Sequence, residues 1–301
     1  MIRTIAISNH YSISLRNEQL VLKPMQADLR EAEVSCIDLG FLILEHPNIS
    51  ITQHAIAALA RYNVAVIFVG DEHLPVSMLF HLETHGVQAE KFDAQIHSTE
   101  PLRKQLWAQT VKSKIENQAG LLKYIGVDYK DVLAMSGRVK SGDIDNLEGQ
   151  AARRYWPRLF GNSFIRDRFG EAPNHLLNYG YTILRAATVR ALCGKGLYPL
   201  MGIHHKNRYN HFALADDMME PFRPFIDWEV WNTFSMHEQS ERLLPIHKTR
   251  LLKLLASDVF IGNSYTNLNH ALEIVAASLA KCFEKGTRKL ILPEFKSIND
   301  F

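Results

Sequence analysis

The hydrophobic pattern of this 301-residue chain changes its period near residue 97, and this change most constrains the fold. Before residue 97, short runs rich in β-branched and aromatic residues alternate with turn residues, as in β-strands. After it, apolar residues recur every three or four positions over long stretches, as in helices. The length favours two unequal domains. We therefore expect an α+β protein, with an N-terminal β-sandwich-like domain over residues 1–90 and a larger all-α domain over residues 91–301.

The N-terminal part contains several short segments with the composition of strands. These are residues 3–8, 11–16, 20–22, 36–44, 64–69 and 76–80. Asn17 and Glu18 predict a turn between the second and third segments. Residues 52–62 instead have helical periodicity, and Ser50 or Thr52 can cap this helix. The polar stretch 83–97 is expected to hold the domain boundary.

The C-terminal part contains a series of helical patterns. They cover residues 102–123, 143–160, 176–193, 221–231, 249–256 and 269–284. Pro157 should bend or end the second of these helices. Gly194 and Gly196 should stop the third. Residues 290–301 contain Pro293 and are expected to form a loose tail.

The charge is unevenly distributed along the chain, although the net charge is only +2. Residues 1–95 carry a net charge of −5 and the remaining residues a net charge of +7. If the chain binds a polyanion, the C-terminal part should bind it. Ordinary variation between domains is the alternative explanation, because the net charge by itself gives no support to nucleic-acid binding.

The composition also suggests where the protein works. No run of about 18 apolar residues is present, so we predict no membrane span. The first residues lack the apolar stretch and cleavage site of a signal peptide. Cys36, Cys193 and Cys282 lie far apart and form no CxxC pair. A cytoplasmic protein without disulfides is expected, in which the cysteines are packing residues.

The densest polar cluster spans residues 202–223, with the sequence GIHHKNRYNHFALADDMMEPFR. It should begin as a loop and become helical from about Phe212. On that helix Asp217 and Glu220 are three positions apart and share a face. Two carboxylates and a histidine that face one point suit Mg²⁺ or Mn²⁺. The alternative is a solvated helix face with a capping histidine.

Zinc is the competing metal for this cluster. His204, His205 and His211 are three conceivable ligands. However, His204 and His205 are adjacent, and the chain has no HExxH motif and no cysteine pair. A zinc hydrolase is therefore disfavoured. The absence of GxGxxG, P-loop and nucleophile-elbow motifs also disfavours nucleotide binding and α/β-hydrolase chemistry.

A second motif, NLEGQAARRYW, covers residues 146–156. Glu148 precedes small residues that permit close approach of another chain segment or of a DNA backbone. Arg153 and Arg154 follow and can pair with phosphates. An ordinary amphipathic helix with solvated arginines is the alternative. Three further cations are weaker candidates for DNA contact, because each is more often a surface charge: Arg166, Lys206 and Arg208.

These motifs together resemble those of a known family, the CRISPR-associated spacer integrases, which are the catalytic subunits of the adaptation complex. The resemblance rests on NLEGQAARRYW, NHLLNYGYTILRAATVRAL, GIHHKNRYNHFALADDMMEPFRPF and the N-terminal NISITQHAIAALARYNVAVIFVGDEHLPVSML. It covers about residues 1–290. The chain looks closest to the type II branch, which is found with single-protein RNA-guided effector nucleases.

The resemblance implies an N-terminal β-sandwich, a helical catalytic domain and a divalent-metal site. By motif position, the catalytic and metal-binding residues are Glu148 in NLEG, His205 in G-x-x-H and Glu220 in MEPFRP. Asp217 matches an acid in or beside that site. His204 doubles the histidine, and the glycine spacing favours His205 as the ligand.

The resemblance further implies the reaction and the partners. A 3′-hydroxyl of a short DNA duplex attacks a phosphodiester at the edge of a CRISPR repeat, with Mg²⁺ or Mn²⁺ as cofactor. A homodimer is expected to form through the N-terminal domains and to assemble with a small ferredoxin-like partner. Two alternatives stay open: a metal-dependent, structure-specific DNA nuclease without integration, and a catalytically silent DNA-binding scaffold.

Overall fold

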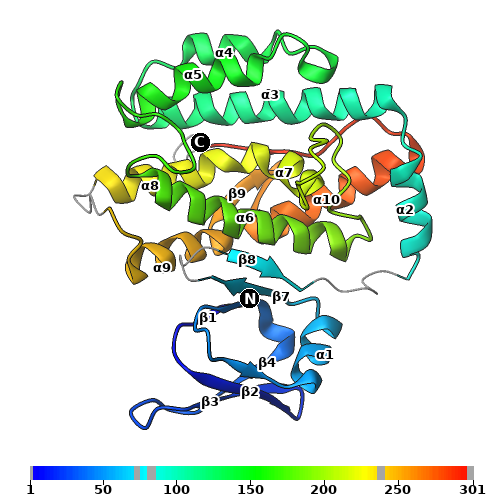
Figure 1. Ribbon diagram of the computed structural model, residues 1–301. Coiled ribbons are helices and arrows are strands. Elements are labelled where there is room, and N and C mark those ends of the chain that lie inside the picture. Colours follow the sequence, from blue (N-terminus) through cyan, green and yellow to red (C-terminus); the bar gives the residue numbers. More distant parts are fainter. Residues whose placement is uncertain (1–2, 71–74, 80–85, 236–240, 297–301) are drawn as a thin grey trace. The chain divides into compact units, whose positions relative to one another are not determined.

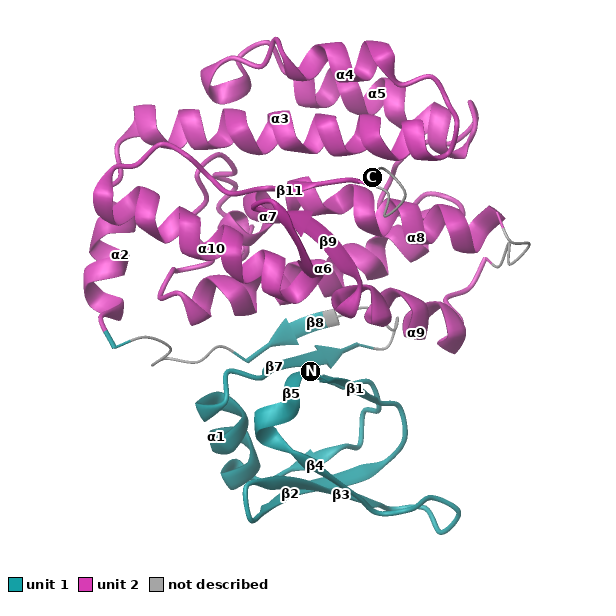
Figure 2. Ribbon diagram, turned by 180° about the vertical axis from the view of Figure 1, so that it is seen from behind, with its two compact units in different colours: residues 1–86 teal, residues 87–301 magenta. Residues whose placement is uncertain are grey.

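The computed structural model describes residues 3–70, 75–79, 86–235 and 241–296 (Figure 1). The chain forms two compact units, residues 1–86 and 87–301 (Figure 2). The first unit is rich in strands and the second is mainly helical. The α+β class predicted from the change of period is therefore confirmed.

The described part of unit 1 contains two four-stranded sheets and one α-helix. The first sheet has the order β1 (Arg3–Ile7), β5 (Leu39–Leu44), β7 (Ala65–Val69) and β8 (Pro75–Met78). Its first three strands are parallel, and β8 is antiparallel to β7. The second sheet has the order β4 (Ala32–Ser35), β3 (Gln19–Pro24), β2 (Tyr11–Arg16) and β6 (Ser50–Ile51). Residues from both sheets and from the helix form one apolar core, which is the β-sandwich-like arrangement expected.

Local signals in unit 1 have the predicted effect at several positions. Asn17 and Glu18 have positive φ angles of 51° and 59° and connect β2 to β3, as in a two-residue hairpin turn. Helix α1 (Gln53–Arg61) begins after Thr52, whose Oγ1 accepts a hydrogen bond from Ala55 N at 3.3 Å. The strand predicted from residue 36 starts only at Leu39, because Cys36–Asp38 form the 3₁₀ turn η1. Strand β4 was not predicted, and residue 80 of the last predicted strand lies outside the described residues.

The described part of unit 2 contains nine α-helices, joined by loops and short 3₁₀ turns. It also contains a three-stranded sheet of order β10 (Ser264–Asn267), β9 (Asp258–Ile261) and β11 (Pro293–Glu294), so the expectation of an all-α domain was wrong within residues 258–294. The helices are α2 (Gln88–Ile96), α3 (Glu100–Tyr124), α4 (Lys130–Ser136), α5 (Leu147–Phe160), α6 (Asn174–Gly194), α7 (Ala213–Met219), α8 (Arg223–Ser235), α9 (Pro245–Lys253) and α10 (Leu268–Lys285). The 3₁₀ turns are η2 (Ser141–Asp143), η3 (Glu220–Phe222) and η4 (Leu254–Ala256). Helix α3 runs the length of the unit, with α4 and α5 on one side of it and α6, α7, α8 and α10 on the other (Figure 1). No described helix is long and apolar enough to cross a membrane.

The long helices of unit 2 form where the periodicity predicted them, whereas two short ones were missed. Helix α2 falls in the polar stretch expected to be a linker, and α4 has only seven residues. Pro157 does not end its helix: α5 continues to Phe160 and stops at Gly161, whose φ is 96°. Pro157 lies in the last turn of α5, so the hydrogen bond that its missing N–H cannot donate affects only the end of the helix.

The prediction of a loose tail from residue 290 was wrong for residues 290–296. Strand β11 (Pro293–Glu294) pairs with β9 (Asp258–Ile261), which also pairs with β10 (Ser264–Asn267). Leu290 is buried, and the Phe295 ring lies 5.1 Å from that of Phe225. The segment is held by pairing with residues far away in the sequence, which local propensity does not predict. Residues 297–301 lie outside the described part.

Candidate active site

Glu148 lies in the first turn of α5, and two left-handed residues set its position. Asp143 and Asn146 have φ angles of 48° and 49°, which Asp and Asn tolerate better than most residues. The Asp143 carboxylate accepts hydrogen bonds from Leu147 N at 2.9 Å and Glu148 N at 3.0 Å. The Asn146 side chain accepts one from Gly149 N at 3.2 Å. The start of α5 is therefore capped on three N–H groups, and Glu148 has a defined direction.

Glu220 follows α7 and begins the 3₁₀ turn η3, which contacts α3. Its side chain is only 5% exposed. Arg223 Nε lies 2.9 Å from Glu220 Oε1, and the Arg223 guanidinium stacks over the Tyr181 ring at 4.4 Å. Burial opposes the charge of Glu220, but Arg223 and Lys114 outweigh it and hold the pKa of Glu220 below its ordinary value. Glu220 is therefore a buried, ionised carboxylate.

Lys114 of α3 connects the two glutamates. Its Nζ atom lies 2.6 Å from Glu148 Oε1 and 2.6 Å from Glu220 Oε2. The lysine side chain is 11% exposed. Burial lowers the pKa of this ammonium, but Glu220 and Glu148 outweigh burial and raise the pKa above its ordinary value. Three elements, α3, α5 and η3, thus bring one cation and two carboxylates to a single point.

Asp217 of α7 fixes the loop that carries the two histidines. Its fully buried carboxylate accepts hydrogen bonds from His204 N at 2.9 Å and His205 N at 3.3 Å. It also contacts His205 Nδ1 at 2.5 Å, and this bond raises the pKa of His205 above its ordinary value. With Nδ1 engaged, Nε2 is the nitrogen of His205 that can bind a metal.

Gly202 permits this close arrangement of loop and helix. A Cβ atom at position 202 would lie 2.6 Å from His205 O and 2.8 Å from Asp217 Oδ2. Both distances are too short for a side chain, so the backbone must approach Asp217 without one. The glycine of the G-x-x-H pattern therefore serves the loop geometry that orients His205.

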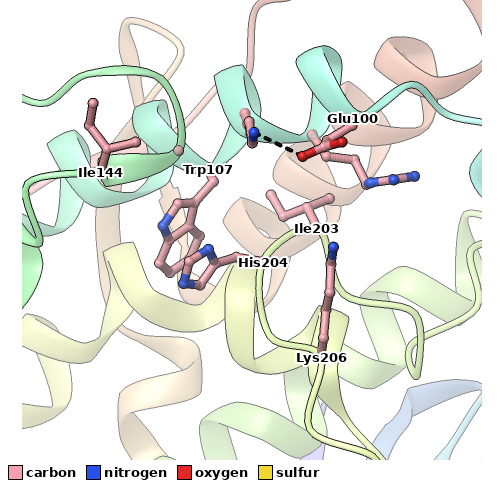
Figure 3. A pocket seen from close by; sticks show the side chains of 9 residues that line it. Glu100, Trp107, Ile144, Ile203, His204 and Lys206 are labelled. Carbon is pink, nitrogen blue, oxygen red and sulfur yellow. Dashed lines mark ion pairs between the residues drawn. The ribbon is translucent and has the colours of Figure 1, made fainter.

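The His204 ring lies against Trp107 of α3. The two rings are stacked, with centroids 4.1 Å apart and an interplanar angle of 2°. They border a cavity of about 260 Å³ (Figure 3). The cavity is lined by Glu100, Arg103, Lys104, Trp107, Gly142, Ile144, Ile203, His204 and Lys206. The adjacent histidines therefore have different environments: His205 is beside the carboxylates, and His204 borders a cavity edged by three cationic side chains.

The donor set at this point fits a divalent metal in type. Glu148, Glu220 and the Nε2 atom of His205 supply the oxygen and nitrogen ligands that Mg²⁺ and Mn²⁺ accept. Within residues 3–70, 75–79, 86–235 and 241–296, no three His, Cys, Asp or Glu side chains are grouped closely enough to hold a metal ion. The side chains therefore suit a divalent metal by their ligand type, while the Lys114 ammonium lies between the two carboxylates.

The five basic residues singled out as DNA contacts fall into two groups. Arg154 pairs with Asp131 at 3.1 Å, and Arg166 donates hydrogen bonds to Asn174 and Asn178 at 2.9 Å each. These two arginines hold parts of unit 2 together. Arg154 is nevertheless exposed, as are the other three: Arg153, Lys206 and Arg208.

Sequence reasoning missed three residues of this region: Lys114, Arg223 and Asp227. Lys114 follows Trp107 and Val111 at helical spacing, so a lysine on the apolar face of α3 was the available signal. Asp227 lies four residues after Arg223 and is buried, and it accepts hydrogen bonds from Tyr155 at 2.8 Å and from Tyr181. The signal there was an acid within the aromatic helix segment RPFIDWEVW.

The two-unit fold is shared with several proteins of known structure. A casposase bound to an integration product matches with a TM-score of 0.82 and 20% identity, over 100% of this chain and 96% of that chain. A CAS1 protein from Thermotoga maritima matches with a TM-score of 0.76 and 14% identity, over 96% of this chain and 99% of that chain. A Cas6-RT-Cas1–Cas2 complex matches with a TM-score of 0.75 and 20% identity, over 96% of this chain and 35% of that chain. At these identities, the similarities establish the fold.

Sequence comparison identifies the family. The family model of the CRISPR-associated protein Cas1 matches residues 5–243. The CRISPR-associated endonuclease Cas1 of Neisseria meningitidis serogroup C (strain 8013) is 32% identical over 302 residues, which cover 99% of this chain and 98% of that protein. The chain therefore belongs to the Cas1 family, and the family resemblance inferred from the motifs is confirmed.

Proposed function

We propose that this chain is a metal-dependent DNA endonuclease and integrase that inserts short DNA duplexes, as new spacers, into a CRISPR array. One observation carries the proposal. Glu148 and Glu220 both contact the buried Lys114 ammonium, and His205, whose bond to Asp217 raises its pKa most, is close enough for both glutamates to raise that pKa further. Membership of a family of endonucleases and the fold shared with a casposase bound to an integration product support it.

Glu148, Glu220 and His205 would hold Mg²⁺ or Mn²⁺. A bound divalent ion polarises the scissile phosphate and stabilises the leaving alkoxide. Asp217 orients His205 and leaves its Nε2 atom available. In the joining reaction, the 3′-oxygen of the incoming strand forms a bond to phosphorus while the bond to the departing 3′-oxygen of the repeat breaks. Because the 3′-hydroxyl of the incoming DNA is itself the nucleophile, no nucleophilic side chain is required.

DNA contacts are assigned to the surface of unit 2. Arg153, Lys206 and Arg208 are exposed cations that can pair with phosphates. Arg154 and Arg166 would act by shaping this surface and by adding positive charge. Spacer sequences vary, so contacts with phosphates should dominate over contacts with bases.

The assembly is assigned to unit 1. We infer that residues 1–90 form a homodimer interface and contact a small ferredoxin-like partner, while residues 91–301 bind DNA and metal. The matching Cas6-RT-Cas1–Cas2 complex supports a protein partner. The net charge of −5 over residues 1–95 suits protein contacts better than DNA contacts.

A strand-transfer assay tests the function. It uses the full chain with and without its small partner, a duplex with free 3′-hydroxyls, and a plasmid that carries a repeat. Joining should require Mn²⁺ or Mg²⁺, stop with chelator, and fall by at least about 10²-fold in Glu148→Ala, His205→Ala and Glu220→Ala. His211→Ala is the matched control, because His211 is an exposed histidine of the same loop.

The outcomes separate the remaining alternatives. Cleavage without joining under all conditions would identify a structure-specific nuclease. DNA binding with neither activity would identify a scaffold. Loss of activity in His211→Ala comparable to that in His205→Ala would favour the zinc interpretation. Full activity in a folded His205→Ala protein would contradict the ligand assignment.

A further inference from the structure

Lys114 is a buried cation that the proposed chemistry does not explain. It projects from the middle of α3 and its side chain is 11% exposed. A buried ammonium is costly unless it is paired. Its two contacts, at 2.6 Å each, are with the two carboxylates assigned above as metal ligands. A lysine placed there for packing alone would need neither contact.

The pairing leaves Glu220 with no oxygen free of a cation. Oε2 contacts the Lys114 ammonium, and Oε1 lies 2.9 Å from Arg223 Nε. A divalent ion that binds Glu220 on the side facing Glu148 therefore meets the Lys114 ammonium. Mg²⁺ contacts its oxygen ligands at about 2.0–2.1 Å, so a dication bridging Glu148 Oε1 and Glu220 Oε2 would lie in the space of the ammonium and would repel it.

Of the two cations, Lys114 is the one able to move. The Arg223 guanidinium is planar and lies over the Tyr181 ring at 4.4 Å, a stacking that fixes its position. The Lys114 ammonium is a point charge at the end of a flexible four-carbon chain. Displacement of Lys114 from both carboxylates would leave the Arg223–Glu220 pair intact.

We propose that the Lys114 ammonium is a built-in counter-ion that holds Glu148 and Glu220 together and competes with the divalent metal for these two carboxylates. This inference rests on the proposed metal site and deepens it. Lys114 keeps two like charges from α5 and η3 close together before a metal binds, and it sets the metal concentration at which the site fills. Lys114 is thus a positioning residue.

Two substitutions with opposite expected effects test the proposal. Lys114→Met removes the charge but keeps the length, so Mn²⁺ should bind about tenfold or more tightly than to the original chain. Lys114→Arg keeps the charge in a guanidinium, which binds carboxylates more strongly than an ammonium does. Mn²⁺ should therefore bind this variant at least about tenfold more weakly than the original chain. Binding is measured on the full chain by isothermal titration calorimetry and by the electron paramagnetic resonance signal of free Mn²⁺. A residue that only supports the fold would weaken binding in both variants.

Thermal stability gives an independent readout. In chelator, Lys114→Met should melt at least about 5 °C lower than the original chain, because two buried carboxylates lose their shared cation. Saturating Mn²⁺ should raise its melting temperature by more than it raises that of the original chain. If Lys114→Met does not fold in chelator, Lys114→Gln replaces it: it also removes the charge, keeps a polar group, and should bind Mn²⁺ more tightly than the original chain.

The controls distinguish failure of this proposal from failure of the proposed function. Lys112→Met changes an exposed lysine of the same helix, whose contact with Glu116 is 3.8 Å, and should leave Mn²⁺ binding unchanged. Glu148→Gln should abolish the measured binding. If no Glu148-dependent binding exists in any variant, the proposed metal site is overturned, and this proposal with it. If Glu148-dependent binding exists with the same affinity in the original chain, Lys114→Met and Lys114→Arg, only the competition is overturned.

Discussion

Two neighbouring aspartates show that the partners of a side chain decide its role. Asp216 pairs with Arg185 Nε at 2.6 Å and accepts a hydrogen bond from Asn210 at 2.8 Å. Asp217, the next residue, instead accepts a hydrogen bond from His205 N and contacts the His205 ring at Nδ1. The quarter-turn between consecutive helix positions separates them. Only Asp217 can therefore orient the proposed ligand, while Asp216 links α6 to α7.

At the residue scale, Asp227 makes the stability of unit 2 depend on pH. Burial, only partly offset by the Tyr181 and Tyr155 hydroxyls, raises the pKa of Asp227 to about 6. The folded chain thus keeps a proton that the unfolded chain releases near pH 4. The contribution of Asp227 to stability is fully present below about pH 4 and is lost as the pH rises to about 6.

Asp227→Asn should therefore become more stable relative to the original chain as the pH rises from 4.5 to 7. The gain should not exceed about 1.4 kcal/mol for each unit by which the pKa is raised. Urea unfolding at a series of pH values measures the difference. Asp131→Asn is the control: the hydrogen bond from Arg158 lowers the pKa of Asp131, so its difference should stay constant over this range. Parallel curves for Asp227→Asn and the original chain would refute the prediction.

At the scale of elements, the start of α5 is the point on which the candidate site depends. Its cap is built from residues that precede the helix, and Glu148 lies within the capped turn. Glu220 lies where α7 passes into η3, a junction without a side-chain cap. Both candidate carboxylate ligands thus lie at helix ends, but only the start of α5 is set by side-chain hydrogen bonds.

Asp143→Gly should loosen this turn without backbone strain, because glycine tolerates the φ angle of 48°. Loss of the bonds to Leu147 N and Glu148 N should destabilise the chain by about 1–2 kcal/mol and lower strand-transfer activity by misplacing Glu148. Denaturant unfolding and the joining assay measure the two effects. Asp145→Gly has the same added glycine but removes only the surface pair with Lys140, so it should cost about 1 kcal/mol less. Equal losses in both variants would mean that the cap contributes nothing.

At the scale of the whole molecule, the separation of charge matches the division of labour that we propose. Residues 1–95 carry a net charge of −5, whereas residues 96–301 carry +7. Phosphate contacts by exposed cations of unit 2 would release counter-ions from DNA. Binding should therefore weaken linearly, on logarithmic axes, as salt rises.

The number of phosphate contacts follows from the slope of that salt dependence. Each contact with duplex DNA contributes about −0.9 to the slope. Arg153→Gln should reduce the magnitude of the slope by about one unit. Lys23→Gln, which removes an exposed cation of unit 1, should leave it unchanged. Fluorescence anisotropy across a salt series measures both, and a flat affinity for the original chain would exclude phosphate-dominated binding.

Sequence patterns predicted the fold class, the long helices and the candidate ligands. Alternation and helical periodicity are local properties, so β2, α3 and α10 could be predicted from neighbouring residues alone. Short elements such as α4 and β11 could not, because a seven-residue helix and a two-residue strand depend on packing rather than on periodicity. Motif position alone selected Glu148, His205 and Glu220.

The amino-acid sequence by itself determined the α+β class, the long helices, the candidate site residues and the family, because all of these depend on local spacing and on residue identity. Only the tertiary structure decided that Lys114 lies between Glu148 and Glu220, that Asp217 binds His205 and that His204 stacks on Trp107. These contacts join residues from different elements. Their distances follow from how α3, α5 and α7 pack against one another, and no spacing along one helix contains that information.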